Sequence, residues 1–239
     1  MTATYVATDS PRRLRAAGWA LHAYTASGTA IAFLALAAAV GGEEVEALWW
    51  LFLALIIDGT DGMLARRLRV KEVIPAFDGA RLDDIVDYIT YCFVPVFLLW
   101  HGGHLPDGRL GTVLAVLPLL ASSYQFCRTD AKTDDHFFLG FPSYWNVLAF
   151  YVIVLDVSPA VTAVLLLTCA VLVFVPIKYV YPSRTAFARG LNLTLAGSWL
   201  VTYAVMLLQF PDPSVVVTFL SLLYVAYYAA VSVVLTLRR

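Results

Sequence analysis

Long apolar runs, separated by short breaks that contain Gly, Pro or charged residues, dominate the sequence. A helix needs about 20 mostly apolar residues to cross the hydrocarbon core of a bilayer. The pattern therefore predicts an all-α integral membrane protein with about eight transmembrane helices. The predicted helices lie near residues 16–40, 46–66, 80–101, 110–127, 143–157, 159–178, 189–210 and 214–236.

The fifth and sixth of these runs are less regular than the others. The run at 143–157 is short, and Asp156, Ser158 and Pro159 mark the only break before the run at 159–178. The pair could form two full spans or a re-entrant hairpin.

The composition agrees with a membrane location. Of the 239 residues, 61% are hydrophobic and 14% are charged, whereas a soluble domain is about 45–50% apolar. The spans occupy most of the chain, so we expect a single membrane domain over residues 1–239 and no nucleic-acid partner. Cys92, Cys127 and Cys169 lie in or beside apolar runs, which argues against a disulfide framework.

The basic residues gather on one side of the eight predicted spans, and only Arg109 falls on the other side. Cytoplasmic loops of membrane proteins are rich in Lys and Arg, so both termini, including residues 1–15, are predicted to be cytoplasmic. The residues on the predicted cytoplasmic side are Arg12, Arg13, Arg15, Arg66, Arg67, Arg69, Lys71, Arg81, Arg128, Lys132, Lys178, Arg184, Arg189, Arg238 and Arg239.

Two carboxylates lie inside the otherwise apolar second run, at Asp58 and Asp61. An ionised Asp in a membrane helix costs about 2.5–3.5 kcal/mol on insertion scales unless it is compensated. At about 100° per residue, Gly62 and Ala65 share the helical face of these acids, and Arg66 lies at its margin. We therefore expect a groove lined by acids and small residues.

A second pair of carboxylates, Asp83 and Asp87, lies one helical turn apart in the third run, while Asp84 points elsewhere. Carboxylates at one depth of adjacent helices repel each other unless they share a cation. All-oxygen ligation favours Mg²⁺ or Mn²⁺ over zinc. The four acids, including Asp58 and Asp61, therefore predict a site for a divalent cation.

The signature formed by these residues spans positions 58–87. It reads Asp58-x2-Asp61-Gly62-x2-Ala65-Arg66, then twelve residues, then Gly79-x3-Asp83-x3-Asp87. This resembles the signature of the CDP-alcohol phosphatidyltransferases. Most of that family has a shorter gap before the second Gly, and a gap of twelve is similar to that of the bacterial phosphatidylcholine synthases. The stretches 21–28 and 135–146 are also similar to that branch, and the likeness covers about residues 15–210.

The resemblance implies a CDP-alcohol phosphatidyltransferase-like bundle in the bacterial inner membrane, with its active site on the cytoplasmic side. It implies transfer of the phosphatidyl group from CDP-diacylglycerol to choline, giving phosphatidylcholine and CMP. The implied partners are these two substrates, membrane lipids and a second copy of the chain in a homodimer.

The resemblance also implies residue roles. Asp58, Asp61 and Asp83 would hold a pair of Mn²⁺ or Mg²⁺ ions on the diphosphate, and Asp87 would be a further metal ligand and the general base. The residues expected at the CDP site are Asp58, Gly62, Ala65, Arg66, Gly79, Thr25 and Ser27. Helical Thr and Ser can equally bond to their own backbone carbonyls, and His22 is expected to be a hydrogen-bonded structural residue.

Choline carries a quaternary ammonium, which aromatic faces bind through cation–π attraction. Tyr91 lies one turn beyond Asp87, and Tyr124, Tyr144 and Trp145 fall near the cytoplasmic ends of the fourth and fifth runs. These four aromatic residues are the predicted choline site. Tyr and Trp also concentrate at membrane interfaces for other reasons.

Other functions are compatible with parts of this pattern. Serine, inositol or glycerol phosphate could replace choline as the acceptor, and a divalent-cation or proton-coupled transporter would also carry intramembrane acids. A structural scaffold would leave those acids unexplained. Four basic residues could contact a lipid phosphate, although the positive-inside pattern alone accounts for each: Lys132, Lys178, Arg184 and Arg189.

Overall fold

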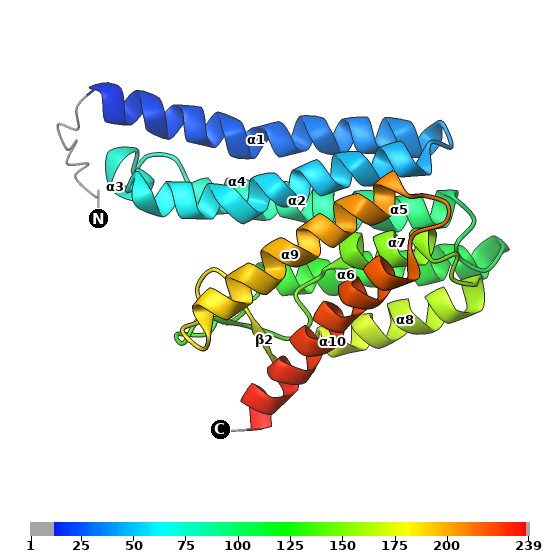
Figure 1. The fold of residues 1–239 in the computed structure, drawn as a ribbon. Coiled ribbons are helices and arrows are strands. Elements are labelled where there is room, and N and C mark those ends of the chain that lie inside the picture. Colours follow the sequence, from blue (N-terminus) through cyan, green and yellow to red (C-terminus); the bar gives the residue numbers. More distant parts are fainter. Residues whose placement is uncertain (1–11, 238–239) are drawn as a thin grey trace.

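The computed structural model describes residues 12–237 as a bundle of helices with one short pair of strands (Figure 1). Residues 1–11 of the predicted N-terminal segment, and the basic pair Arg238 and Arg239, lie outside the described residues. The helices are α1 Arg12–Val40, α2 Glu44–Arg67, α3 Val70–Val73, α4 Gly79–Asp87, α5 Val94–His101, α6 Gly108–Cys127, α7 Trp145–Val154, α8 Pro159–Leu172, α9 Arg189–Leu208 and α10 Val215–Leu237, with a π-helical segment η1 Tyr88–Phe93. The strands are β1 Phe137–Leu139 and β2 Lys178–Val180.

Five helices within residues 12–237 are long and apolar enough to cross a membrane, namely α1, α2, α6, α9 and α10. In addition, α4, η1 and α5 follow one another without a break from residue 79 to residue 101. The sequence prediction of a mostly helical membrane protein is therefore confirmed.

The helices α7 and α8 are shorter than the sequence predicted. They contain 10 and 14 residues, which at about 1.5 Å per residue gives lengths of about 15 and 21 Å. The sixth predicted helix was expected to reach residue 178, and this boundary is wrong because α8 ends at Leu172. Apolar composition alone did not distinguish the end of this helix from the apolar, non-helical chain at residues 173–177 that follows it.

Extended chain precedes α7 and follows α8, and the two extended segments bond to each other. Gly140 N–H donates to Ile177 O at 2.9 Å, and Phe141 N–H donates to Leu172 O at 3.0 Å. Further along, β1 and β2 pair antiparallel. Such non-helical backbone is tolerated at membrane depth where protein satisfies its hydrogen bonds.

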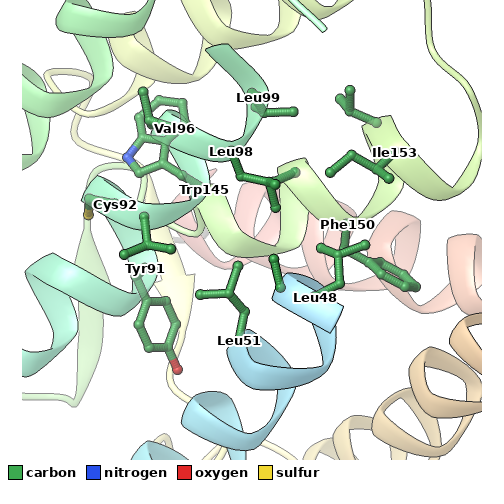
Figure 2. Packing of buried hydrophobic residues seen from close by; sticks show 14 of the residues in the cluster. Leu48, Leu51, Tyr91, Cys92, Val96, Leu98, Leu99, Trp145, Phe150 and Ile153 are labelled. Carbon is green, nitrogen blue, oxygen red and sulfur yellow. The ribbon is translucent and has the colours of Figure 1, made fainter. Parts of the chain in front are cut away.

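The core joins α2 to α5 and α7. Figure 2 shows Leu48 and Leu51 of α2 among Leu98 of α5 and Trp145 and Phe150 of α7, all of them buried. On the other side, α1 lies along α2 (Figure 1). This packing fixes α2 between α1 on one side and α5 and α7 on the other.

The absence of a side chain at Gly28 lets α1 approach α4 closely. A Cβ added there would lie 2.5 Å from Cγ1 of Val86, closer than any real Cβ contact. The approach brings α1 beside the two helices that carry the signature acids.

Candidate active site

Three of the four signature acids converge on one point. Asp58 of α2 and Asp83 and Asp87 of α4 each direct a carboxylate oxygen so that the three oxygens lie within 4.8 Å of one another. Ligand oxygens on opposite sides of one Mg²⁺ are about 4.2 Å apart, because each lies about 2.1 Å from the ion. The donor set and its spacing therefore fit a hard divalent cation, as the sequence predicted for these three residues.

Asp61 is the fourth signature acid, and α1 holds it in place. Its side chain is buried, at 5% exposure, and accepts a hydrogen bond from Thr25 Oγ1 at 2.7 Å. It lies close enough to Asp58 and Asp83 to interact with them electrostatically, although it is outside the group of three converging oxygens. Thr25 thus reaches the site through Asp61.

Ser27 does not reach the acids in this arrangement. Its hydroxyl donates to the backbone oxygen of Tyr24, 2.6 Å away in the same helix. This is the local backbone bonding that helical Ser and Thr commonly make.

Gly62 and Arg66 lie against each other on the exposed side of the acid groove. A Cβ added at Gly62 would lie 3.3 Å from Nη1 of Arg66, and the Arg66 guanidinium attracts the carboxylate of Asp61. Ala65 is half-buried next to them. The structure therefore leaves the small residues and the guanidinium together at the margin of the groove.

Gly79 begins α4 and is packed against His22 of α1. A Cβ at Gly79 would lie 2.6 Å from His22 Cε1, and the His22 ring also contacts Phe77, with centroids 4.4 Å apart. The buried Nε2 of His22 has no hydrogen-bond partner among the described residues. His22 is therefore held by ring packing, and the expectation that it is hydrogen-bonded is wrong at Nε2.

Two of the four predicted choline-site residues lie together beside the acids. The Tyr91 hydroxyl donates to Asp58 Oδ2 at 2.5 Å, and the Tyr144 ring lies 6.0 Å from the Tyr91 ring. Tyr144 also interacts electrostatically with Asp58. Its ring contacts Phe138 and Tyr228 at 6.5 and 6.2 Å, and we call Tyr91, Phe138, Tyr144 and Tyr228 the aromatic cluster.

The other two predicted residues lie elsewhere. Trp145 is fully buried in the core, and its Nε1 donates to Ser122 Oγ at 2.7 Å. Tyr124 is 46% exposed and packs against Phe174. The structure does not bring either side chain to the acids, because closeness to a helix end does not determine which way a side chain points.

Sequence reasoning missed two residues near the site and left the role of a third open. Phe138 and Tyr228 belong to the aromatic cluster, and Phe138 falls in the stretch 135–146 that the sequence had singled out for its resemblance. Lys132 was expected either to contact a lipid phosphate or to serve only the topology, and its ammonium attracts the carboxylates of the converging acids and of Asp84. The sequence alone does not tell whether a basic residue in a loop contacts the active site or only sets the membrane topology.

Ion pairs fix the loop that carries Lys132. The Arg128 guanidinium donates to both oxygens of Asp130 at 2.6 and 2.7 Å and holds the pKa of that carboxyl below its usual value. Lys178 Nζ donates to Asp135 at 2.6 Å, which likewise lowers the pKa of Asp135.

No protein-family model matches the chain, but curated relatives do. It is 40% identical over 223 residues to the phosphatidylcholine synthase of Legionella pneumophila, covering 90% of this chain and 87% of that protein. It is 40% identical over 198 residues to the phosphatidylcholine synthase of Pseudomonas aeruginosa, covering 82% of each. The enzyme of that name from Agrobacterium fabrum is 41% identical over 199 residues, covering 82% of this chain and 81% of the relative. The chain belongs to the phosphatidylcholine synthase family.

Membership of the phosphatidylcholine synthase family confirms the branch that the twelve-residue gap before Gly79 indicated. The chain is thus a multi-pass membrane protein of that family. Its converging acids, the hydroxyl of Tyr91 and the flanking cations form a site that could hold a divalent cation beside an anionic substrate.

Proposed function

We propose that the chain transfers the phosphatidyl group from CDP-diacylglycerol to choline, giving phosphatidylcholine and CMP. The observation that carries the proposal is the convergence of Asp58, Asp83 and Asp87 on one point, in a member of the phosphatidylcholine synthase family. A transporter would distribute its acids along a pathway, whereas these acids meet between two adjacent helices.

The proposed metal ligands are the four signature acids, with Asp61 completing the group of Asp58, Asp83 and Asp87. When bound, a pair of Mn²⁺ or Mg²⁺ ions would neutralise charge on the diphosphate and on the departing CMP. Tyr91 and Thr25 orient Asp58 and Asp61 through hydrogen bonds, which is the usual function of residues that contact metal ligands.

Asp87 is the proposed general base. The choline oxygen forms a bond to the lipid-side phosphorus, the bond from that phosphorus to the oxygen of CMP breaks, and the hydroxyl proton passes to Asp87. Asp87 is suited to this because it lies at the acid cluster and on the same helical stretch as Tyr91 of the aromatic cluster.

The proposed nucleotide site lies on the Gly62 side of the acids. Gly62, Ala65 and Gly79 leave room for the cytidine nucleotide, and Arg66 pairs with its phosphate. The nearness of the Arg66 guanidinium to Gly62 supports this assignment. Asp58 completes the site, and Thr25 acts through its hydrogen bond to Asp61. Ser27 is left out of the proposed nucleotide site because its hydroxyl bonds to the backbone of its own helix.

The proposed choline site is the aromatic cluster. A quaternary ammonium donates no hydrogen bond, and aromatic rings attract it through their faces. Tyr144 is central because it contacts Tyr91, Phe138 and Tyr228. This grouping supports choline over serine or inositol, which would need polar partners for a carboxylate or for ring hydroxyls.

We propose eight membrane crossings in a single domain over residues 1–239, in a bacterial inner membrane and as a homodimer. The crossings at α7 and α8 would each combine a short helix with extended chain that is hydrogen-bonded inside the protein. Figure 1 supports cytoplasmic placement of the site, because the start of α1, the region of α3 and β2 lie at one end of the bundle. These elements carry Arg12, Lys71 and Lys178, which belong to the basic residues predicted to be cytoplasmic.

Paired variants test the proposed reaction. Purified protein should release CMP from CDP-diacylglycerol only with Mn²⁺ or Mg²⁺ and an acceptor, and Asp83→Asn should lower this rate by at least about 100-fold. Asp84→Asn is the matched control, because Asp84 is adjacent in sequence but outside the converging group. Equal loss in both variants, or CMP release without a divalent cation, would contradict the assignment.

A further inference from the structure

Lys132 faces the acid cluster without forming an ion pair. Its ammonium attracts the carboxylates of Asp58, Asp83 and Asp87. Yet within residues 12–237 it has no ion pair with N–O distance of 4.0 Å or less. The neighbouring cations Arg128 and Lys178 both form such pairs.

The position of Lys132 is set by the fold rather than by its own charge. Its backbone forms a bridge with Phe138, and Phe138 packs against Tyr144 of the aromatic cluster. Thr133, the next residue, accepts a hydrogen bond from the backbone N–H of Phe137 at 3.0 Å. The backbone at Lys132 is therefore held beside the aromatic cluster, on the side of the acids where the acceptor is proposed to bind, and it carries an exposed side chain.

A lysine that served only to neutralise the acids would gain most by direct contact with them, because Coulomb attraction rises as the distance falls. Lys132 instead stands back from the carboxylates. An ammonium that lies near the acids without bonding to them is free to bind an anion that also contacts a cation held by the acids. Lysine binds phosphate well as a compact point charge.

We propose that Lys132 binds the lipid-side phosphate of the CDP-diacylglycerol diphosphate, the phosphate that choline attacks. This rests on the proposed function, which supplies a diphosphate at the acids. The assignment to the lipid-side phosphate follows from position: Arg66 lies on the Gly62 side, whereas Lys132 is linked through Phe138 to Tyr144 at the acceptor side.

Binding of soluble nucleotides tests this without turnover. CDP carries a second phosphate in the place of the lipid-side phosphate, and CMP lacks it. In the presence of Mg²⁺, calorimetric titration should show that Lys132→Met binds CDP about tenfold more weakly than the wild type, as expected for one charge-assisted hydrogen bond. Its affinity for CMP should stay within about twofold of the wild type, since that phosphate lies at Arg66.

Two further variants control for charge and folding. Lys132→Arg should retain most of the CDP affinity, and Lys71→Met should match the wild type, because Lys71 is an exposed lysine of α3. Unchanged CDP affinity in Lys132→Met, or equal weakening of CDP and CMP, would overturn the role of Lys132. Failure of the wild type to bind either nucleotide would instead overturn the proposed function, and this inference with it.

Discussion

The hydroxyl of Tyr91 donates a hydrogen bond to the carboxylate of Asp58, with the two oxygens 2.5 Å apart. The bond joins α2 to the helical stretch that carries Asp83 and Asp87, and it leaves from the π-helical segment η1. Segments of this kind occur frequently at functional sites. Tyr91 therefore orients one acid of the cluster from the helix that supplies the others.

Tyr91→Phe should weaken metal binding. Loss of a partner that orients a metal ligand typically costs 10–100-fold in affinity, so the Mn²⁺ concentration for half-maximal activity should rise by about that factor. Tyr88→Phe is the matched control, because the Tyr88 hydroxyl donates to the backbone oxygen of Leu119, away from the acids. The same metal dependence in both variants would show that Tyr91 does not orient Asp58 for the metal.

Thr25→Val should impair activity, and Ser27→Ala should not. The first change removes the hydroxyl that donates a hydrogen bond to the buried carboxylate of Asp61 at 2.7 Å. Leaving that carboxylate without this partner costs about 1–3 kcal/mol. The second removes only a bond to Tyr24 in the same helix. Initial rates at saturating substrate would check the difference, and equal activity of the two variants would refute it.

Tyr144→Leu should raise the KM for choline more than it lowers kcat. Loss of a cation–π contact at a desolvated site costs about 2 kcal/mol, or about 30-fold in affinity. Tyr124→Leu should leave the KM for choline unchanged, because Tyr124 packs against Phe174 at the surface. A KM shift in the Tyr124 variant instead would place choline elsewhere.

The ion pair between Asp135 and Lys178 should give a small, pH-dependent stabilisation. Lys178 lowers the pKa of Asp135 from its ordinary value of 3.8, so the pair stabilises the fold above that pH and is lost as the pH falls through the lowered pKa. Because the Asp135 side chain is 54% exposed, the contribution is below about 1 kcal/mol.

Thermal melting in detergent would measure this effect. Asp135→Asn should melt slightly below the wild type at neutral pH, and the difference should vanish once the pH is below the lowered pKa. The adjacent exposed Asp134 provides the control variant, Asp134→Asn. If the melting temperatures of Asp135→Asn and the wild type still differed in strong acid, the Asp135–Lys178 ion pair would not be the cause of the difference.

The sequence was sufficient to predict the long helices and the acid cluster, for physical reasons. Runs of apolar residues define spans, and buried charges such as Asp58 are too costly to occur without a partner. Helical spacing also placed Asp83 and Asp87 on one face, as the structure shows.

The direction of side chains and the paths of connecting segments could not be predicted in this way. Tyr144 and Trp145 are adjacent in sequence, yet one belongs to the aromatic cluster and the other to the core. The end of α8 at Leu172 depends on hydrogen bonds to an extended segment more than thirty positions earlier. The position of Lys132 near the acids depends on the pairing of its loop with Phe138, which its place in the sequence does not indicate.

An acceptor panel tests the central claim most directly. Purified protein would be incubated with Mn²⁺ or Mg²⁺, CDP-diacylglycerol and radiolabelled choline, serine or inositol in parallel, and the lipid product and CMP would be measured. Phosphatidylcholine and CMP are expected in equal amounts with choline, and no lipid product is expected with the other acceptors. Product with serine and none with choline would contradict the claim.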